Sequence, residues 1–160
     1  MDAQEVGDRM MKTTAVCVLV LGVTAAPLSA QNPPIESRTQ GTITSEMIGR
    51  RFGAMTLKHA ATDPDYAFSE KHPVMVKGGL GEGGHNVYRF LNALRGPDGQ
   101  HVQYSRVGSC CAFKTKKSPL GGDLLDVYEV SYDGYAPRRM YFNWYDDGEI
   151  LIPVGFSAAK

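Results

Sequence analysis

Two adjacent cysteines, Cys110 and Cys111, are the residues of this chain whose type and spacing best allow chemistry. In an oxidising compartment two lone cysteines tend to pair. Adjacent α-carbons, however, lie only about 3.8 Å apart across a trans peptide, below the usual disulfide range. A bridge between them would form a stiff ring that kinks the end of a strand. In a regular strand the two thiols would instead point to opposite faces and could not bond.

The sequence leaves several states open for this cysteine pair: a vicinal disulfide, free thiols with one buried in the core, intermolecular pairing, or metal binding. Metal binding ranks last, because adjacent cysteines lack the C-x2-C spacing and no histidine is near them in sequence. Nucleophilic catalysis by either thiol needs a histidine within reach, and the candidates are His59, His72, His85 and His101. The sequence assigns no catalytic residue, no metal ligand and no cofactor.

A basic and glycine-rich segment follows the cysteines, and we predict that it forms the rim of a binding site together with them. A solvated loop and a small anion patch are the two interpretations of its lysines. The predicted rim residues are Lys114, Lys116, Lys117, Gly121 and Gly122. Three tyrosines are further candidates for a binding face: Tyr135, Tyr141 and Tyr145.

Asp126 stands out because it lies on the presumed core face of a strand-like run, 124–130, among apolar residues. An unpaired carboxylate is costly to bury. We therefore predict that Asp126 pairs with Arg89 or Arg106 on a neighbouring strand, or with backbone donors.

Residues 1–30 are predicted to be a secretory signal peptide, cleaved after Ala30. They contain a lysine, a dozen uncharged residues and a small-residue exit, which is the order typical of such signals. The apolar run is shorter than the roughly 20 residues needed to cross a bilayer. Acidic residues precede the lysine, so translation is expected to start at Met10 or Met11. We expect an exported protein, periplasmic or secreted, without a transmembrane segment.

Length and charge limit the remaining choices. The chain has 160 residues, with 17 basic and 17 acidic side chains, so bulk charge implies neither nucleic acid nor an anionic membrane as partner. We predict a disordered tether over 31–44 and a single domain over 45–160. A small ligand or another component of the cell envelope fits such a domain, although the sequence identifies no partner.

One amphipathic helix is predicted over 46–60, capped by Thr44 or Ser45. The proline of Asp63-Pro64 prevents its continuation. The prediction depends on apolar residues at helical spacing, which are Ile48, Phe52 and Met55.

Most of the remaining domain is predicted to be antiparallel sheet. Alternation and turn residues predict strands over 74–77, 85–94, 102–104, 124–132, 140–144 and 150–154. The run GGLGEGG, Gly78 to Gly84, is interpreted as a flexible connector, because it lacks the Gly-Lys-Ser/Thr ending of a phosphate-binding P-loop. The predicted fold is α+β: a mainly antiparallel meander of about five strands with one N-terminal helix packed on it.

Five motifs, in their order along 60–156, resemble a family of small exported bacterial proteins of unknown function, many of them lipoproteins. The motifs are ATDPDYAFSEKHPVMVKGG, YRFLNALRGPDGQ, VGSCCAFKT, GGDLLDVYEVSYDG and YDDGEILIPVGF. Members often carry the automatic name 2-dehydro-3-deoxyphosphooctonate aldolase. This chain departs from the lipoprotein pattern, since no cysteine stands at the expected signal cut.

The predicted function is therefore a binding or structural module of the cell envelope, since no complete catalytic constellation is present. The alternative is a small thiol- or carboxylate-dependent enzyme that uses Cys110 or Cys111 with a histidine, or Asp126. The aldolase activity implied by the family's automatic name ranks third, because that enzyme is a (β/α)8 barrel of about 250 residues.

Overall fold

A computed structural model of the protein describes residues 44–160. The predicted signal peptide, 1–30, and the predicted tether, 31–44, lie outside the described residues apart from Thr44. In chain order the elements are α1 (Ser45–Gly49), the 3-10 helix η1 (Arg50–Phe52), β1 (Val74–Met75), α2 (Gly79–Ala93), β2 (Leu94–Arg95), β3 (Gln103–Lys114), β4 (Gly122–Tyr132), β5 (Tyr135–Asn143) and β6 (Ser157–Ala158). The α+β prediction is confirmed. None of the helices in the described part is both long and apolar enough to span a bilayer.

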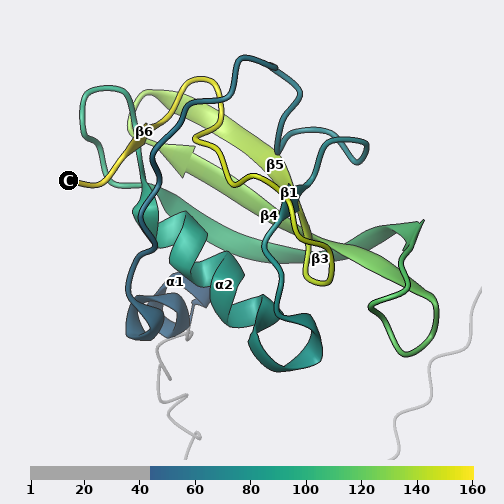
Figure 1. The fold of residues 1–160 in the computed structure, drawn as a ribbon. Helices are drawn as coiled ribbons and strands as arrows, with labels where there is room; N and C mark the ends of the chain where they lie inside the picture. Colours follow the sequence, from purple (N-terminus) through teal and green to yellow (C-terminus); the bar gives the residue numbers. More distant parts are fainter. Residues whose placement is uncertain (1–43) are drawn as a thin grey trace, which may run out of the picture. The chain divides into compact units, whose positions relative to one another are not determined.

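The main sheet has the strand order β1-β5-β4-β3, with α2 across one face (Figure 1). β1 runs parallel to β5, and the other neighbours are antiparallel. Pairing between β4 and β5 ends at Asp126 and Phe142, whereas β3 and β4 stay paired as far as Lys114 and Gly122. The far ends of β3 and β4 therefore form a two-stranded ribbon beyond the sheet. β2 and β6 make a separate antiparallel pair.

The hydrophobic core lies between α2 and the sheet. Val87, Phe90 and Leu91 of α2 are fully buried, and their spacing places them on one side of a helix. The ring of Phe90 meets Phe142 edge-on at 5.7 Å, and Tyr128 meets Phe142 at 5.5 Å. These contacts fix one face of β4 and β5 against the helix.

The predicted strand over 85–94 and the predicted connector over 78–84 are both wrong, because residues 79–93 form α2. The physical reason is tertiary. A side-chain carbon built on Gly83 would lie 2.6 Å from Cβ of Trp144, so glycine is needed here for close approach of helix and sheet, not for flexibility. Alternating apolar residues over 85–94 also satisfy a helical period, and a short segment does not separate the two.

The predicted helix over 46–60 is much shorter in the structure: α1 has 5 residues and η1 has 3. Thr44 caps α1 as predicted, its hydroxyl accepting a backbone N–H bond. Asn92 of α2 donates to the carbonyls of Gly49 at 2.9 Å and Gly53 at 2.7 Å. These bonds hold the chain at the end of η1, where Gly53 has a φ of 68°, which glycine adopts without strain. The helix packed across the sheet is α2, not the predicted N-terminal one.

The other predicted strands agree in part. Strand β4 lies where expected, β1 is shorter than the predicted 74–77, and β5 begins before the predicted 140–144. The predicted strand over 102–104 is only the start of β3, which continues to Lys114. Gly96 to Gly99 form a turn, with a bond of 3.0 Å from Gly99 N–H to the Gly96 carbonyl. The predicted strand over 150–154 is reduced to one bridge between Ile152 and Ala60. The strand nearest the C-terminus is β6 instead.

Candidate functional site

Cys110 and Cys111 form a vicinal disulfide, with α-carbons 3.8 Å apart. The structure thus selects one of the states that the sequence left open. Cys110 pairs with Leu125 and Ala112 pairs with Leu124, so Cys111 is an extra residue in a β-bulge. Its φ of 59° lies in the left-handed region. The kinked ring therefore lies inside β3, and not at the end of a strand as predicted.

A second bulge lies four residues earlier in β3. Arg106 pairs with Tyr128 and Gly108 pairs with Val127, so Val107 is the extra residue. Because side chains alternate along a strand, each extra residue reverses the alternation. The two bulges cancel for the rest of the strand, and only the segment between them is inverted.

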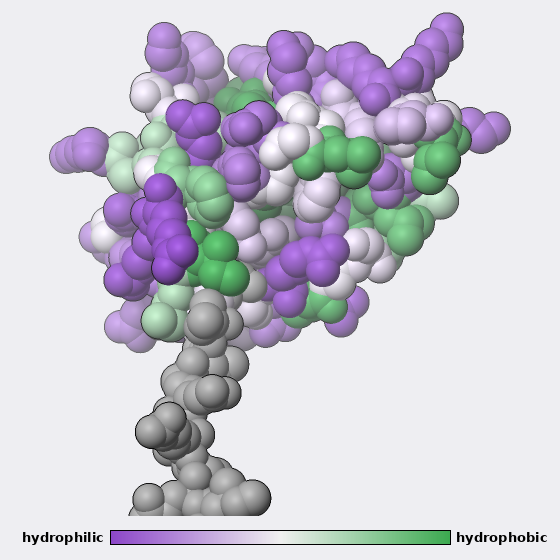
Figure 2. Space-filling model, turned by 90° about the horizontal axis from the view of Figure 1, so that it is seen from below, coloured by the Kyte–Doolittle hydropathy of each residue, from purple (hydrophilic) through white to green (hydrophobic). Residues whose placement is uncertain are grey.

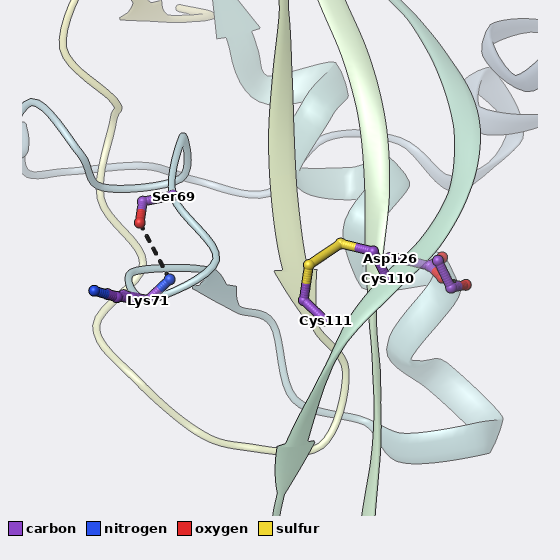
Figure 3. The surroundings of a disulfide bond; sticks show 6 residues. Ser69, Lys71, Cys110, Cys111 and Asp126 are labelled. Atoms are coloured by element: carbon purple, nitrogen blue, oxygen red, sulfur yellow. Dashed lines mark hydrogen bonds between the residues drawn. A yellow bond between two sulfur atoms is a disulfide. The ribbon is translucent and has the colours of Figure 1, made fainter.

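The inverted segment sends Ser109 and Cys110 to opposite faces of the sheet. Ser109 lies opposite Asp126 on the α2 face, and Cys110 lies opposite Leu125 on the other face. Figure 3 shows the sulfur atoms on one side of the strands and the Asp126 carboxylate on the other.

A shallow hollow of about 160 Å³ lies on the face away from α2, beside the disulfide. The apolar side chains that line it are Val107, which is 50% exposed, Val127 and the ring of Tyr141. Arg139 adds an exposed cation, and Glu129 lies directly opposite Arg139 in the pairing of β4 with β5. The complete lining is Val107, Gly108, Ser109, Cys110, Val127, Arg139 and Tyr141.

On the α2 face, Asp126 is the centre of a hydrogen-bonded ion pair. Its side chain is 5% exposed and accepts from Arg106 through Nε at 2.9 Å and Nη2 at 2.8 Å. Ser109 Oγ donates to Asp126 Oδ1 at 2.9 Å. The hydrogen bond that Arg106 donates to Asp126 raises the pKa of Arg106. Of the two arginines considered for this role, Arg106 is the partner. The network holds the inverted segment from behind.

Two buried tyrosines beside this network stay neutral at physiological pH. Burial raises the pKa of Tyr104 to about 12, and the nearby Glu46 carboxylate adds to the shift. Burial also raises the pKa of Tyr128, with a further contribution from Tyr88. Neither phenol is suited to act as a base near pH 7.

Three of the four candidate histidines lie beside carboxylates elsewhere in the domain. His72 lies 2.5 Å from Asp63, His85 lies 3.4 Å from Glu82, and His101 lies 3.8 Å from Glu46. The lining of the hollow contains no histidine, and residues 44–160 contain no group of three or more side chains placed to hold a metal ion. The hollow therefore combines apolar side chains, one cation and a disulfide.

The predicted rim lies at the tip of the ribbon, away from the lining of the hollow. Lys114 ends β3, Lys116 and Lys117 are exposed in the turn, and Gly121 and Gly122 lead into β4. A 2.7 Å bond from Thr115 Oγ1 to Asp146 Oδ1 attaches this turn to the segment after β5. The structure therefore brings Cys110 to the hollow but separates it from the lysines and glycines.

Val107, Val127 and Arg139 were not recognised from the sequence. Alternation in β4 and β5 could have placed Val127 and Tyr141 together, opposite Tyr128. The two bulges bring Val107 and Cys110 beside Val127 and Tyr141. The alternation of apolar and polar residues does not reveal where such bulges occur. Of the candidate tyrosines, Tyr141 lines the hollow, whereas Tyr145 is buried at 5% exposure.

The helical side of the domain carries a second hollow of about 430 Å³, which has no cysteine in its lining; the lining is Arg50, Gly53, Ala54, Leu91, Asn92, Arg95, His101 and Val102. Figure 2 shows that hydrophobic side chains surface there in several separate places between polar ones. Singly exposed apolar residues are ordinary on soluble proteins.

Comparison with family models, with curated proteins and with solved structures finds no match for this chain. The resemblance to the family of small exported proteins therefore stays a prediction.

Proposed function

We propose that this chain is an exported, single-domain binding module of the cell envelope, and that its ligand occupies the hollow beside Cys110. The observation that carries the proposal is an apolar surface on the sheet face opposite α2, with one exposed cation at its margin. The core occupies the helix side of the sheet, and the hollow lies on the side that the core does not use.

The size and lining of the hollow indicate the class of ligand. Its volume is about 160 Å³; an enclosed cavity of roughly 150 Å³ holds benzene, so this open hollow has room for one ring but covers only part of it. Tyr141 and Val127 provide an apolar floor on which a ring can lie, and Arg139 can take a carboxylate in a two-point contact. A small ligand with an aromatic or apolar body and a carboxylate fits these features.

Glu129 limits the strength of this binding, because it lies directly across from Arg139. An opposite charge in a cross-strand pair contributes roughly 0.2–1 kcal/mol, and an anionic ligand must compete with it. Glu129→Gln is therefore expected to tighten binding of an anionic probe by about 1.5- to 5-fold.

The test is an NMR titration of the protein with phenylacetate, and with 2-phenylethanol as an uncharged probe of similar shape. Phenylacetate is expected to shift the amide signals of residues 107–110, Val127 and Tyr141. Arg139→Gln should weaken the binding of phenylacetate by about 2- to 10-fold, the usual range for one hydrogen-bonded contact. Binding of 2-phenylethanol should not respond to Arg139→Gln.

Arg138→Gln is the matched control. Arg138 is the neighbouring residue, but its guanidinium lies 3.7 Å from the ring centroid of Phe68 and donates to Tyr135, so the variant should bind phenylacetate normally. Equal effects of the two variants, or no shifts around the hollow, would reject the binding site. Export is tested separately: the intact mass of protein from the exported fraction should equal that of a chain that begins at Gln31.

A further inference from the structure

We propose that Cys110–Cys111 is a thiol–disulfide exchange site, and that its reduction by a dithiol reshapes the hollow. The inference rests on the proposed binding function, because it makes the redox state of the disulfide the regulator of that hollow. Three features support it: access to one sulfur, the backbone conformation of Cys111, and anchors on both sides of the bulge.

The first feature is access. Both cysteines are partly exposed, and Cys110 lines the open hollow. Exchange begins when a thiolate of the reductant attacks Sγ of Cys110. The Cys110–Cys111 bond breaks, a mixed disulfide forms on Cys110, and Cys111 leaves as a thiolate and takes up a proton. The second thiol of the dithiol then attacks the other sulfur of the same dithiol in the mixed disulfide. This step releases Cys110, which takes up the second proton. Two electrons and two protons pass to the protein, and the reductant leaves as a disulfide.

The second feature is the backbone of Cys111. Its φ of 59° is left-handed, a conformation disfavoured by about 5- to 30-fold per residue other than glycine. While the ring is closed, the disulfide ties Cys111 to its neighbour within this bulge. Opening the ring removes that tie, so Cys111 is then free to return to the extended region that a strand prefers.

The third feature is the pair of anchors that confine the change. Arg106 and Ser109 are bound to Asp126 on one side of the disulfide. On the other side, Thr115 is bound to Asp146 at 2.7 Å. With both ends held, slipping of the whole ribbon by one residue is opposed. The rearrangement must therefore fall mainly between the anchors, over 110–114, where Cys110 belongs to the wall of the hollow.

Hydrogen exchange of the full-length protein, with and without dithiothreitol as the dithiol, tests the switch without any ligand. Peptide mapping after alkylation reports Cys110 and Cys111 separately from Cys17. Reduction should speed exchange by about 10-fold or more in peptides covering 107–113 and 122–127, and leave α2 unchanged. Unchanged exchange after complete reduction, or a disulfide that dithiothreitol does not reduce, would overturn the proposal.

Two double variants test whether the backbone of Cys111 is the element that switches. Cys110→Ser with Cys111→Gly removes the disulfide but allows a positive φ without cost, so its exchange should resemble the oxidised protein. Cys110→Ser with Cys111→Val disfavours the left-handed conformation and should resemble the reduced protein. Identical exchange in the two variants would contradict the mechanism.

Phenylacetate titration then links the switch to binding. Reduction should weaken the binding of phenylacetate by threefold or more. An unchanged affinity would reject regulation of the hollow, even if hydrogen exchange changes on reduction. If phenylacetate binds neither form while hydrogen exchange responds to reduction, the proposed ligand class fails and the redox switch stands.

Discussion

Gly83→Ala is expected to destabilise the protein, although alanine is a better helix former than glycine. The added carbon would lie 2.6 Å from Cβ and 2.9 Å from Cγ of Trp144. These atoms are next to the backbone of Trp144, so they cannot move aside as the end of a flexible side chain can. Overpacking of this kind costs about 1–3 kcal/mol, and the helix propensity of alanine returns up to about 1 kcal/mol. We expect a net loss of about 1 kcal/mol in the free energy of unfolding.

Gly81→Ala is the matched control, in the same helix and two residues away. No atom lies within 4 Å of a side-chain carbon built on Gly81, so this variant should gain about 0.5–1 kcal/mol. Urea unfolding followed by circular dichroism measures both variants. The midpoint should move down for Gly83→Ala and up for Gly81→Ala, with the same slope against urea.

The opposite signs are what test the structure. Gly81→Ala alone does not distinguish a helix from a loop at this position. In a loop, too, replacing glycine by alanine stabilises the protein, because it lowers the conformational entropy of the unfolded chain. A flexible connector over 78–84 would give Gly83→Ala a neutral or stabilising effect. Such a result would show that α2 does not begin in the glycine run and does not pack against Trp144.

Two further predictions concern the buried polar groups. Asp126→Asn should lower the free energy of unfolding by about 1–3 kcal/mol, because it weakens the bonds to Arg106 and Ser109; a change below about 0.5 kcal/mol in urea unfolding would contradict it. Tyr104 has a folded-state pKa of about 12, above the value near 10 of an unfolded chain, so its contribution is complete below pH 10 and is lost as the pH rises through 12. Urea midpoints measured from pH 9 to 12 should fall less steeply with pH for Tyr104→Phe than for the natural protein. An equal fall in both proteins would exclude a contribution of Tyr104 to the loss of stability at alkaline pH.

The parts of the fold that sequence predicts well are those governed by neighbouring residues. In β4 and β5, apolar residues alternate and Asp133-Gly134 turns the chain, where Gly134 has a φ of 80°. Both signals are local, and both strands overlap the ranges predicted for them. The pairing of Asp126 with an arginine follows from the cost of burying a carboxylate, which holds whichever partner supplies the charge.

The parts that sequence could not predict depend on residues far apart in the chain. Glycines at 78–84 favour a loop on local grounds, and only Trp144 gives Gly83 a packing role. The helix predicted over 46–60 is cut short where Asn92 binds the carbonyl of Gly53. In both cases a contact across some 40 to 60 residues overrides the local preference, and no window of sequence contains it.

The candidate site was still harder to predict from sequence, because its geometry depends on where bulges interrupt the alternation of side chains along β3. Two adjacent cysteines in a regular strand would face opposite ways, as the sequence argument states. The bulges at Val107 and Cys111 instead invert only the segment between them. One consequence joins the two faces of the sheet: Ser109 bonds to buried Asp126, while its neighbour Cys110 lines the hollow. A change in the disulfide therefore acts directly beside the ion pair, and weakening that pair with Asp126→Asn should also loosen the wall of the hollow.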